Sequence, residues 1–301
     1  MSVRLDEHSR IVAVGASGPY GSAQVAFMRG AGSQIVAAAA LGRGGETIDG
    51  LPVHDHVVDA VQAGNADTAM IYVPAAGVKQ AVLDCADAGV TLAAVAAEFV
   101  PVHDTLYALA YARERGMLVV GPNTVGMSSP GKAMLGAIAP NFTLPGRVGL
   151  IGRSGTLTMT IARLLTARGI GQSSIVHVGG DSLAGANPAE WLGLFLDDPE
   201  TTAIAYVGEI GGTKEYQMLE PIAASGKPIV AMVVGRHAPP GKRMGHAGAM
   251  VGGVRETAAA KLAALSEAGA IACTSPLALA DAIAEQTGGG SGPGVQTRIA
   301  A

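Results

Sequence analysis

The segment GRHAPPGKRMGHAGAMVGG, residues 235–253, gathers the side chains best suited to chemistry. Arg236, Lys242, Arg243 and His246 lie among glycines, so an imidazole is presented on adaptable backbone in a locally positive field. A loop of this length inside an α/β domain is usually functional. His246 could therefore act as a nucleophile that accepts a phosphoryl group.

Two other segments could complete such a site. Glu209 follows an apolar run and could accept a hydrogen bond from the His246 ring, which would leave the opposite ring nitrogen free to attack. Ser154, Gly155 and Thr156 follow another apolar run and open a predicted helix, whose amides could receive the phosphate. Each residue also has a structural reading, as a surface histidine, a solvated carboxylate or a helix-capping serine. No pattern suggests more than a structural role for His8, His54, His56, His103, His177 and His237.

A glycine-rich turn, GASGPYG at residues 15–21, joins the first predicted strand to a helix. Backbone in such a turn can approach a phosphate, whose negative charge the start of the helix favours. The spacing is G-x-x-G-x-x-G rather than the G-x-G-x-x-G of dinucleotide enzymes. Arg43 follows the second strand, where those enzymes carry an acid, and suits the extra ribose phosphate of CoA or NADP. The alternative is a simple tight turn beside a solvated Arg43.

Short apolar runs alternate with helical spacing, so the elements that position these residues form two α/β halves. Strands that are apolar throughout and followed by helices predict parallel sheets covered on both faces. The first half is predicted to be Rossmann-like and the second flavodoxin-like. Predicted strands are residues 11–14, 35–40, 68–73, 91–96, 117–120, 147–151, 175–178, 203–207, 228–234 and 270–272. Predicted helices are residues 22–29, 78–88, 105–115, 188–196 and 256–268.

A stretch rich in Gly, Pro and Ser interrupts this rhythm and marks a domain boundary. We expect a Rossmann-like domain over residues 1–125, a linker over 126–146, a second domain over 147–287 and a flexible tail over 288–301.

Composition narrows the class of protein. The 301 residues suffice for two domains, and 49% hydrophobic with 15% charged residues indicates a globular chain. A net charge of −4 without blocks of like charge argues against nucleic acid as a partner. The apolar runs fall short of the roughly 20 residues that cross a membrane. The two cysteines lack metal-type spacing and the N-terminus lacks signal-peptide layout, so we expect a cytoplasmic protein that has no metal site.

The chain resembles the alpha subunits of succinyl-CoA synthetase over nearly its whole length. Matching segments are LPV (51–53), YVPA (72–75), GPN (121–123), SGTLT (154–158), VGGD (178–181), GEIGG (208–212) and the highly specific GKRMGHAGA (241–249). The resemblance implies that His246 is a phosphohistidine oriented by Glu209, and that the first domain binds CoA rather than NADP. The CoA contacts that it implies are Ser17, Gly18, Pro19, Tyr20, Arg43, Tyr72, Val73, Pro74, Ala97, Glu98 and Asn123.

The resemblance further implies a nucleotide-dependent acid–CoA ligase. Phosphate would pass from ATP or GTP to His246, then to the acid as an acyl phosphate, which the CoA thiol displaces. The sequence has no Walker-type motif and no room for a nucleotide-grasping domain. An ATP-grasp beta subunit that holds the nucleotide and Mg²⁺ is therefore expected, in an alpha–beta or alpha2–beta2 assembly.

The chain departs from the family pattern around the expected acid site. Met159 stands where the family usually has a tyrosine next to the substrate, and a thioether cannot donate a hydrogen bond. Residues 124–125 and 96–97 also differ. We expect a roomier or less polar pocket, for succinate or a related acid such as malate or a bulkier carboxylate.

Two other classes of function compete with this interpretation. An NADP-dependent oxidoreductase would leave the histidine loop without a role. A non-catalytic CoA-binding module would leave the intact His246 and Glu209 unexplained.

Overall fold

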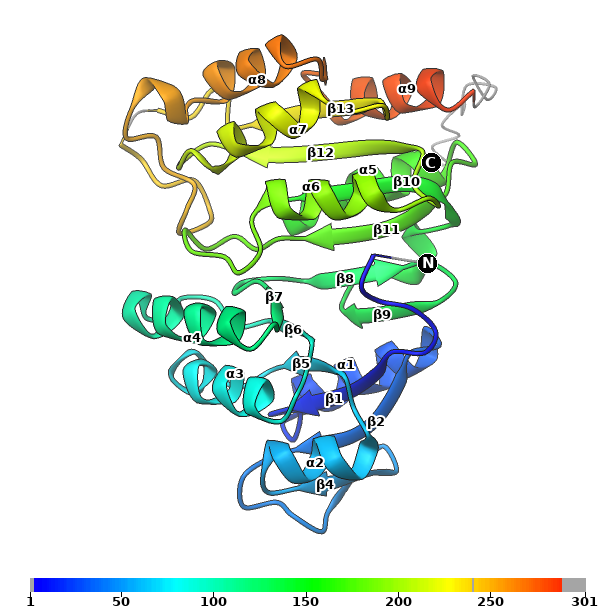
Figure 1. The fold of residues 1–301 in the computed structure, drawn as a ribbon, viewed down its shortest axis with the longest axis vertical. Helices are drawn as coiled ribbons and strands as arrows, with labels where there is room; N and C mark the ends of the chain where they lie inside the picture. The colour runs from blue at the N-terminus through cyan, green and yellow to red at the C-terminus, as the bar shows by residue number, and fades with distance from the viewer. Residues whose placement is uncertain (1–2, 240, 289–301) are drawn as a thin grey trace, which may run out of the picture.

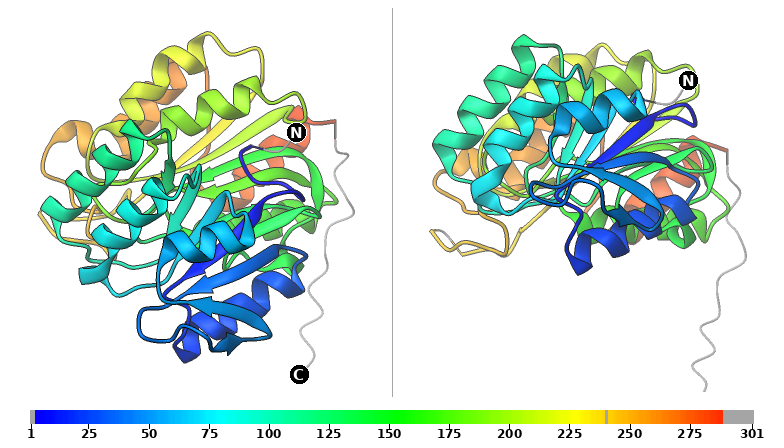
Figure 2. Two further views of the ribbon diagram at one scale, coloured as in Figure 1. Left: turned by 60° about the horizontal axis from the view of Figure 1, so that its bottom comes forward. Right: turned by 90° about the horizontal axis from the view of Figure 1, so that it is seen from below.

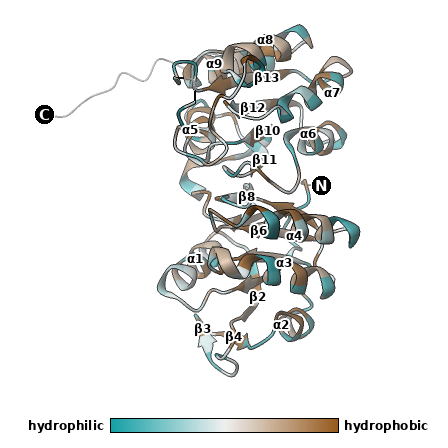
Figure 3. Cartoon of the chain, turned by 90° about the vertical axis from the view of Figure 1, so that its left-hand side faces the viewer, coloured by the Kyte–Doolittle hydropathy of each residue, from teal (hydrophilic) through white to brown (hydrophobic). Residues whose placement is uncertain are grey.

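The computed structural model describes residues 3–239 and 241–288. The chain forms two α/β domains, which follow one another along the long axis of the molecule, and each is built around its own sheet (Figure 1). The strands of both sheets are mostly hydrophobic, whereas the helices that cover them carry hydrophilic residues on their outer sides (Figure 3).

The first sheet has the order β3-β4-β2-β1-β5-β6-β7. All of its pairs are parallel except the short β3–β4 pair. Without β3, the strands follow the 3-2-1-4-5-6 order of Rossmann domains, which confirms the predicted fold class. The strands are β1 (Arg10–Val14), β2 (Gln34–Ala39), β3 (Thr47–Ile48), β4 (Leu51–His54), β5 (Thr68–Ile71), β6 (Leu92–Val95) and β7 (Leu118–Val120).

Helices cover both faces of this sheet. The helix α1 (Pro19–Gly30) packs on one face, and α2 (Val57–Gly64), α3 (Val78–Asp87) and α4 (Val102–Glu114) pack on the other (Figure 2). Alternate residues of β1 divide accordingly, because side chains along a strand point to opposite faces. Ile11 joins the core beneath α1, and Val12 joins the core beneath the other three helices.

The second sheet has the order β14-β13-β12-β10-β11-β8-β9. Its five parallel strands follow the 2-1-3-4-5 order of flavodoxin-like domains, as predicted. These strands are β10 (Pro145–Gly152), β11 (Gln172–His177), β12 (Ala203–Glu209), β13 (Ile229–Val234) and β14 (Ile271–Ala272). The helices are α5 (Gly155–Thr166), α6 (Pro188–Asp197), α7 (Leu219–Ala223), α8 (Ala258–Glu267) and α9 (Pro276–Gln286). Single 3-10 turns are η1 (Ala75–Gly77), η2 (Pro140–Phe142), η3 (Lys214–Met218) and η4 (Val254–Glu256).

Residues 126–146, expected to form a linker, instead contribute strands to the second sheet. β8 (Gly126–Ser129) and β9 (Ala133–Gly136) form a hairpin, and β8 pairs antiparallel with β11. Ser33 of the first domain binds this hairpin through two hydrogen bonds. Its hydroxyl donates to the Met134 carbonyl at 2.7 Å and accepts from the Met134 amide at 2.9 Å. The hairpin therefore connects the two domains, and we propose a domain boundary near residue 125.

The predicted strands and helices occur within a few residues of their expected positions. Besides the hairpin, the sequence pattern missed α2, α7, α9 and the β3–β4 pair, which are short or weakly patterned. Residues 289–301 of the predicted tail lie outside the described residues. No helix within residues 3–239 and 241–288 has the length and apolar character needed to cross a membrane.

Candidate active site

The predicted pairing of histidine and carboxylate is present at the end of β12. Nδ1 of His246 lies 3.1 Å from Oε2 of Glu209. Glu209 is buried, whereas 30% of the His246 side chain is exposed. The hydrogen bond with Glu209 raises the pKa of His246, and the charges of Glu209 and Asp181 raise it further. Burial and the charge of Arg153 act in the opposite direction. Donation from Nδ1 leaves the lone pair of Nε2 available.

Two glycines, Gly180 and Gly211, lie in close contact with the histidine loop. A Cβ atom on Gly180 would lie 2.8 Å from Cγ of the His246 ring. Gly211 has φ +85°, and a Cβ atom there would lie 2.0 Å from the Gly248 carbonyl oxygen. The Gly248 amide also donates to the Gly180 carbonyl at 3.3 Å. The imidazole thus rests directly on backbone, which restricts where the ring can lie.

The start of α5 opens into the same cleft as His246. Ser154 is the N-cap residue, but its side chain makes no capping hydrogen bond, so the first-turn amides are not satisfied by it. Gly155, Thr156 and Met159 line a cleft of about 260 Å³ together with His246. The cleft lies between the domains, and its remaining lining residues are Tyr20, Met70, Tyr72, Ala96, Asn123, Thr124, Val125, Gly136, Ala137 and His177.

His177 is a cleft residue whose position the sequence did not reveal. It ends β11 and is buried. The Val125 amide donates to its Nδ1 at 3.0 Å, and its Nε2 lies 3.1 Å from the Arg153 carbonyl, to which it must donate. Burial lowers the pKa of His177 to about 4. Both ring nitrogens are occupied and the ring is neutral, so His177 shapes the cleft and cannot serve as a nucleophile there.

The glycine-rich turn between β1 and α1 is tightly built. Gly15 has φ +76°, and a Cβ atom on it would lie 2.6 Å from Cγ1 of Val73. A Cβ atom on Gly21 would lie 2.5 Å from the Ala16 Cα atom. Gly18, by contrast, faces open space and precedes α1 without any side-chain cap. Pro19, the first residue of α1, has no amide hydrogen, so the amides that could face an anion begin at Tyr20.

Other residues predicted to contact CoA surround this turn or the cleft. Nη1 of Arg43 lies 3.3 Å from the Ser17 carbonyl oxygen, while its Nε is engaged by Glu46 at 2.8 Å. Tyr20 packs edge-on against Tyr72, with ring centroids 6.0 Å apart.

Residues that follow β6 and β7 line the cleft that holds His246 on the side of the first domain. The Asn123 amide donates to the Ala97 carbonyl at 2.8 Å, and its side chain donates to Asp181 at 3.1 Å. Glu98 and Pro74 are exposed. Burial, and then the charge of Glu98, raise the pKa of Asp181, although the Asn123 hydrogen bond opposes this shift.

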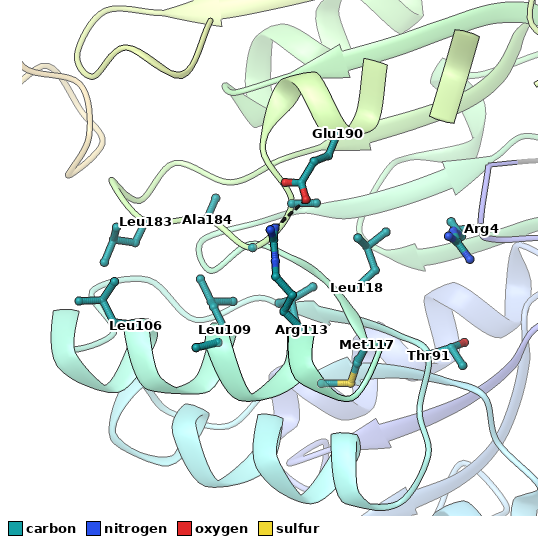
Figure 4. Close-up of a pocket in the computed structure, with 15 residues that line it drawn as sticks. Arg4, Thr91, Leu106, Leu109, Arg113, Met117, Leu118, Leu183, Ala184 and Glu190 are labelled. Carbon is teal, nitrogen blue, oxygen red and sulfur yellow. Dashed lines mark hydrogen bonds and ion pairs between the residues drawn. The ribbon is translucent and has the colours of Figure 1, made fainter. Parts of the chain in front are cut away.

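A second cleft between the domains, of about 500 Å³, lies between α4 and residues 183–190 (Figure 4). An ion pair of 2.6 Å between Arg113 and Glu190 spans it. None of the predicted site residues lines this cleft. Nowhere in the described parts of the chain do three or more His, Cys, Asp or Glu side chains gather as potential metal ligands.

A Rossmann domain with an open glycine-rich turn is followed by a flavodoxin-like domain with a carboxylate-held histidine, and both domains match families of CoA enzymes. Residues 6–99 match the family model of the CoA binding domain, and residues 151–271 match that of CoA-ligase. The chain belongs to the family of alpha subunits of ADP-forming succinate–CoA ligases.

Named relatives extend along almost the full chain. The chain is 43% identical over 285 residues to succinate–CoA ligase [ADP-forming] subunit alpha 2 of Archaeoglobus fulgidus, covering 95% of this chain and 99% of the relative. It is 37% identical to malate–CoA ligase subunit alpha of Methylorubrum extorquens, covering 95% and 98%. ATP citrate lyase from Methanothrix soehngenii, solved with citrate and coenzyme A, superposes with a TM-score of 0.83 at 25% identity, covering 94% of this chain and 51% of that one.

Proposed function

We propose that this chain binds CoA and carries phosphate on His246 for a nucleotide-dependent acid–CoA ligase. The observation that carries the proposal is the shared cleft, in which the Glu209-bound imidazole and the start of α5 occur together. A neutral ring with Nδ1–H held by a carboxylate is the nucleophilic form of histidine.

The proposed reaction has three balanced transfers. Nε2 of His246 attacks the terminal phosphorus of the nucleotide, so that a P–N bond forms while the bond to the departing nucleoside diphosphate breaks. The substrate carboxylate then takes the phosphoryl group and frees the imidazole. Finally the CoA thiol, losing its proton, attacks the acyl carbon and releases inorganic phosphate. Glu209 stabilises positive charge on the ring, and the amides of α5 hold the phosphoryl oxygens.

The accessible turn at the start of α1 supports a phosphate of CoA at this position. We propose that residues 17–20 and Arg43 hold the phosphates, and that residues 72–74, 97–98 and Asn123 line the path of the pantetheine arm toward the cleft. The Tyr20–Tyr72 contact lies both beside the turn and in the lining of the cleft, which suits such a path.

The nucleotide and its Mg²⁺ are proposed to bind an ATP-grasp beta subunit. The relatives are named as alpha subunits, and their description as ADP-forming favours ATP over GTP. The two cysteines, Cys85 and Cys273, are buried and unpaired, which favours a reducing compartment such as the cytoplasm.

The acid is proposed to bind next to Met159. Apolar side chains of Val125, Ala137 and Met159 line this part of the cleft, which favours an acid with more apolar bulk than succinate. Turnover of succinate, malate and larger carboxylates by the reconstituted pair of subunits measures this preference. A clear preference for succinate would rule out the altered specificity while leaving the ligase function intact.

Replacement of His246 tests the proposed phosphate carrier. We expect His246→Asn to abolish both the transfer of radiolabel from ATP to this chain and thioester formation, because asparagine has no nucleophilic ring nitrogen. His237→Asn is the matched control, since His237 is exposed in the same loop and lacks the contact with Glu209. Undiminished thioester formation by His246→Asn would refute the proposal. CoA binding without any labelling of the wild type, with the beta subunit present, would favour the non-catalytic module.

A further inference from the structure

Three charged side chains and a tyrosine are buried together beneath the Glu209–His246 pair. Arg153 is 6% exposed, Glu215 and Lys261 are each 1% exposed, and Tyr206 is fully buried. Charged groups are rarely buried so completely, because each must give up its hydration. This buried ion cluster lies outside the cleft that holds His246.

Lys261 connects the cluster to the backbone on both sides of Ile210. Its Nζ donates to the Glu209 carbonyl at 2.8 Å and to the Gly211 carbonyl at 2.7 Å. The same atom lies 2.7 Å from Oε2 of Glu215. An ammonium group has three donors, so all three have an acceptor within reach. One amine therefore clamps the turn whose first side chain holds His246.

Arg153 reaches the same turn from the neighbouring strand. Its Nη1 lies 3.3 Å from the Gly211 carbonyl and 3.2 Å from Oε1 of Glu215, which also accepts from the Tyr206 hydroxyl at 3.2 Å. A Cβ atom on Gly248 would lie 3.2 Å from Nη2 of Arg153, so the guanidinium also lies against the histidine loop. Arg153 directly precedes Ser154, the N-cap residue of α5.

Stability alone is a poor explanation for Lys261. Apolar residues of similar volume can replace buried ion pairs without loss of stability. Lys261 and Arg153 together balance the two buried carboxylates, Glu215 and Glu209, but charge balance alone does not require the amine to lie between two backbone carbonyls. What Lys261 adds is a pair of strong hydrogen bonds to the two carbonyls of the 209–211 turn.

We propose that Lys261 is a positioning residue for phosphoryl transfer: it fixes the 209–211 turn so that the Glu209 carboxylate stays aligned with His246. This inference rests on the proposed role of His246 as the phosphate carrier. Arg153 and Glu215 hold the amine in place and tie the turn to the histidine loop and to the start of α5.

The test is Lys261→Met, assayed as single-turnover phosphorylation of the reconstituted alpha–beta pair by labelled ATP over a range of pH. Glu215 keeps its ion pair with Arg153 in this variant, so its carboxylate is not left without a cation. We expect the phosphorylation rate to fall by about 10- to 100-fold, as small misplacements of catalytic groups do. In steady-state thioester formation, the KM for CoA should change less than about twofold, because the proposed CoA-binding residues lie in the other domain.

The pH dependence separates positioning from a general loss of stability. A misaligned Glu209 raises the pKa of His246 less, so the acid limb of the rate profile should move to lower pH. Lys214→Met is the matched control, since Lys214 lies in the adjacent η3 and contacts neither carbonyl. We expect this control to keep the wild-type rate and acid limb.

A folded Lys261→Met pair with the wild-type rate and an unmoved acid limb would overturn the inference. If Lys261→Met does not fold, Lys261→Gln is assayed in its place. Its amide is neutral and stands on a shorter side chain, so we expect the same fall in rate and the same shift of the acid limb, and the absence of both would overturn the inference. A wild-type pair that accepts no label at all would instead refute the proposed function. The two failures are therefore distinguishable.

Discussion

Two histidines of one cleft differ in their electrostatic surroundings. His246 faces a carboxylate, which raises its pKa, whereas His177 is enclosed by amide and carbonyl groups, and burial lowers its pKa to about 4. His246 keeps an unoccupied Nε2 while His177 has both nitrogens engaged. The residue type alone does not separate these roles, but the partners of each ring do.

Glu209→Gln tests the electrostatic part of this arrangement. The amide oxygen can still accept from Nδ1, but the negative charge is lost. The pKa of His246 should therefore fall toward its ordinary value, and the acid limb of phosphorylation should move to lower pH, since the neutral ring then persists to lower pH. The plateau rate should drop by at least about tenfold, because the ring becomes positive during transfer. Rates of single-turnover labelling between pH 5 and 9 measure both effects, and an acid limb that stays in place would contradict them.

Three neighbouring strands deliver the groups that build the site. β12, β10 and β11 lie side by side, and their carboxyl ends carry Glu209, Arg153 and His177 in that order. Because parallel strands end at one edge of a sheet, residues far apart in sequence meet there. His177 ties this edge to the first domain, since its ring bonds Val125 on one side and the Arg153 carbonyl on the other.

The pH dependence of stability should report on His177. An unfolded histidine has a pKa of about 6.5, and the folded value is about 4. The unfolded state thus binds more protons between these values, so the stabilisation is complete above pH 6.5 and is lost as the pH falls toward 4. The loss from this group is on the order of 3 kcal/mol for a shift of this size.

Urea unfolding of wild type and His177→Gln at pH 7.5 and 4.5 measures this contribution. The stability advantage of the wild type should shrink by about 2–3 kcal/mol at the lower pH. His103→Gln, an exposed substitution on α4, serves as the control and should show no such change relative to wild type. Parallel losses in wild type and His177→Gln would show that the histidine does not control acid sensitivity.

At the scale of the whole molecule, the two domains share a core. One cluster of buried apolar side chains extends from Ile11 and Met28 of the first domain, through Met127 and Leu135 of the hairpin, to Trp191 of the second. This shared packing fixes how the two domains lie relative to each other. The exposed Arg113–Glu190 ion pair, which spans the second cleft, is a further contact between them. Exposed pairs of this kind contribute only about 0–1 kcal/mol.

Leu135→Ala tests whether the hairpin is part of that core. Leu135 is fully buried, so its truncation should lower the free energy of unfolding by about 2–5 kcal/mol. Leu144→Ala in the same segment is the matched control, since Leu144 is 37% exposed and should cost less than about 1 kcal/mol. Urea denaturation of both variants gives the comparison. Equal, small effects would mean that residues 126–146 behave as a simple connection.

Local pattern in the sequence is sufficient to predict both sheets, and the resemblance to a known family adds the pairing of His246 with Glu209, 37 positions apart. Apolar runs, glycine turns and the GHAGA motif are encoded within a few residues of one another, so they can be read without knowledge of the fold. Residues 126–146 are predicted as a linker because the segment is rich in glycine, proline and serine and its strands are short. Only the pairing of β8 with β9 and with β11 makes it a hairpin within the second sheet.

Contacts between distant segments were decided by the tertiary structure alone. No local pattern gives the contacts of His177, Gly180 and Lys261, which come from neighbours 24 to 66 positions away. These are Arg153 for His177 (|i−j| 24), Glu209 for Lys261 (|i−j| 52) and His246 for Gly180 (246 − 180 = 66). The physical reason is that strand order within a parallel sheet is set by packing of the whole domain. Which side chains share an edge, and therefore which pKa values shift, depends on that order.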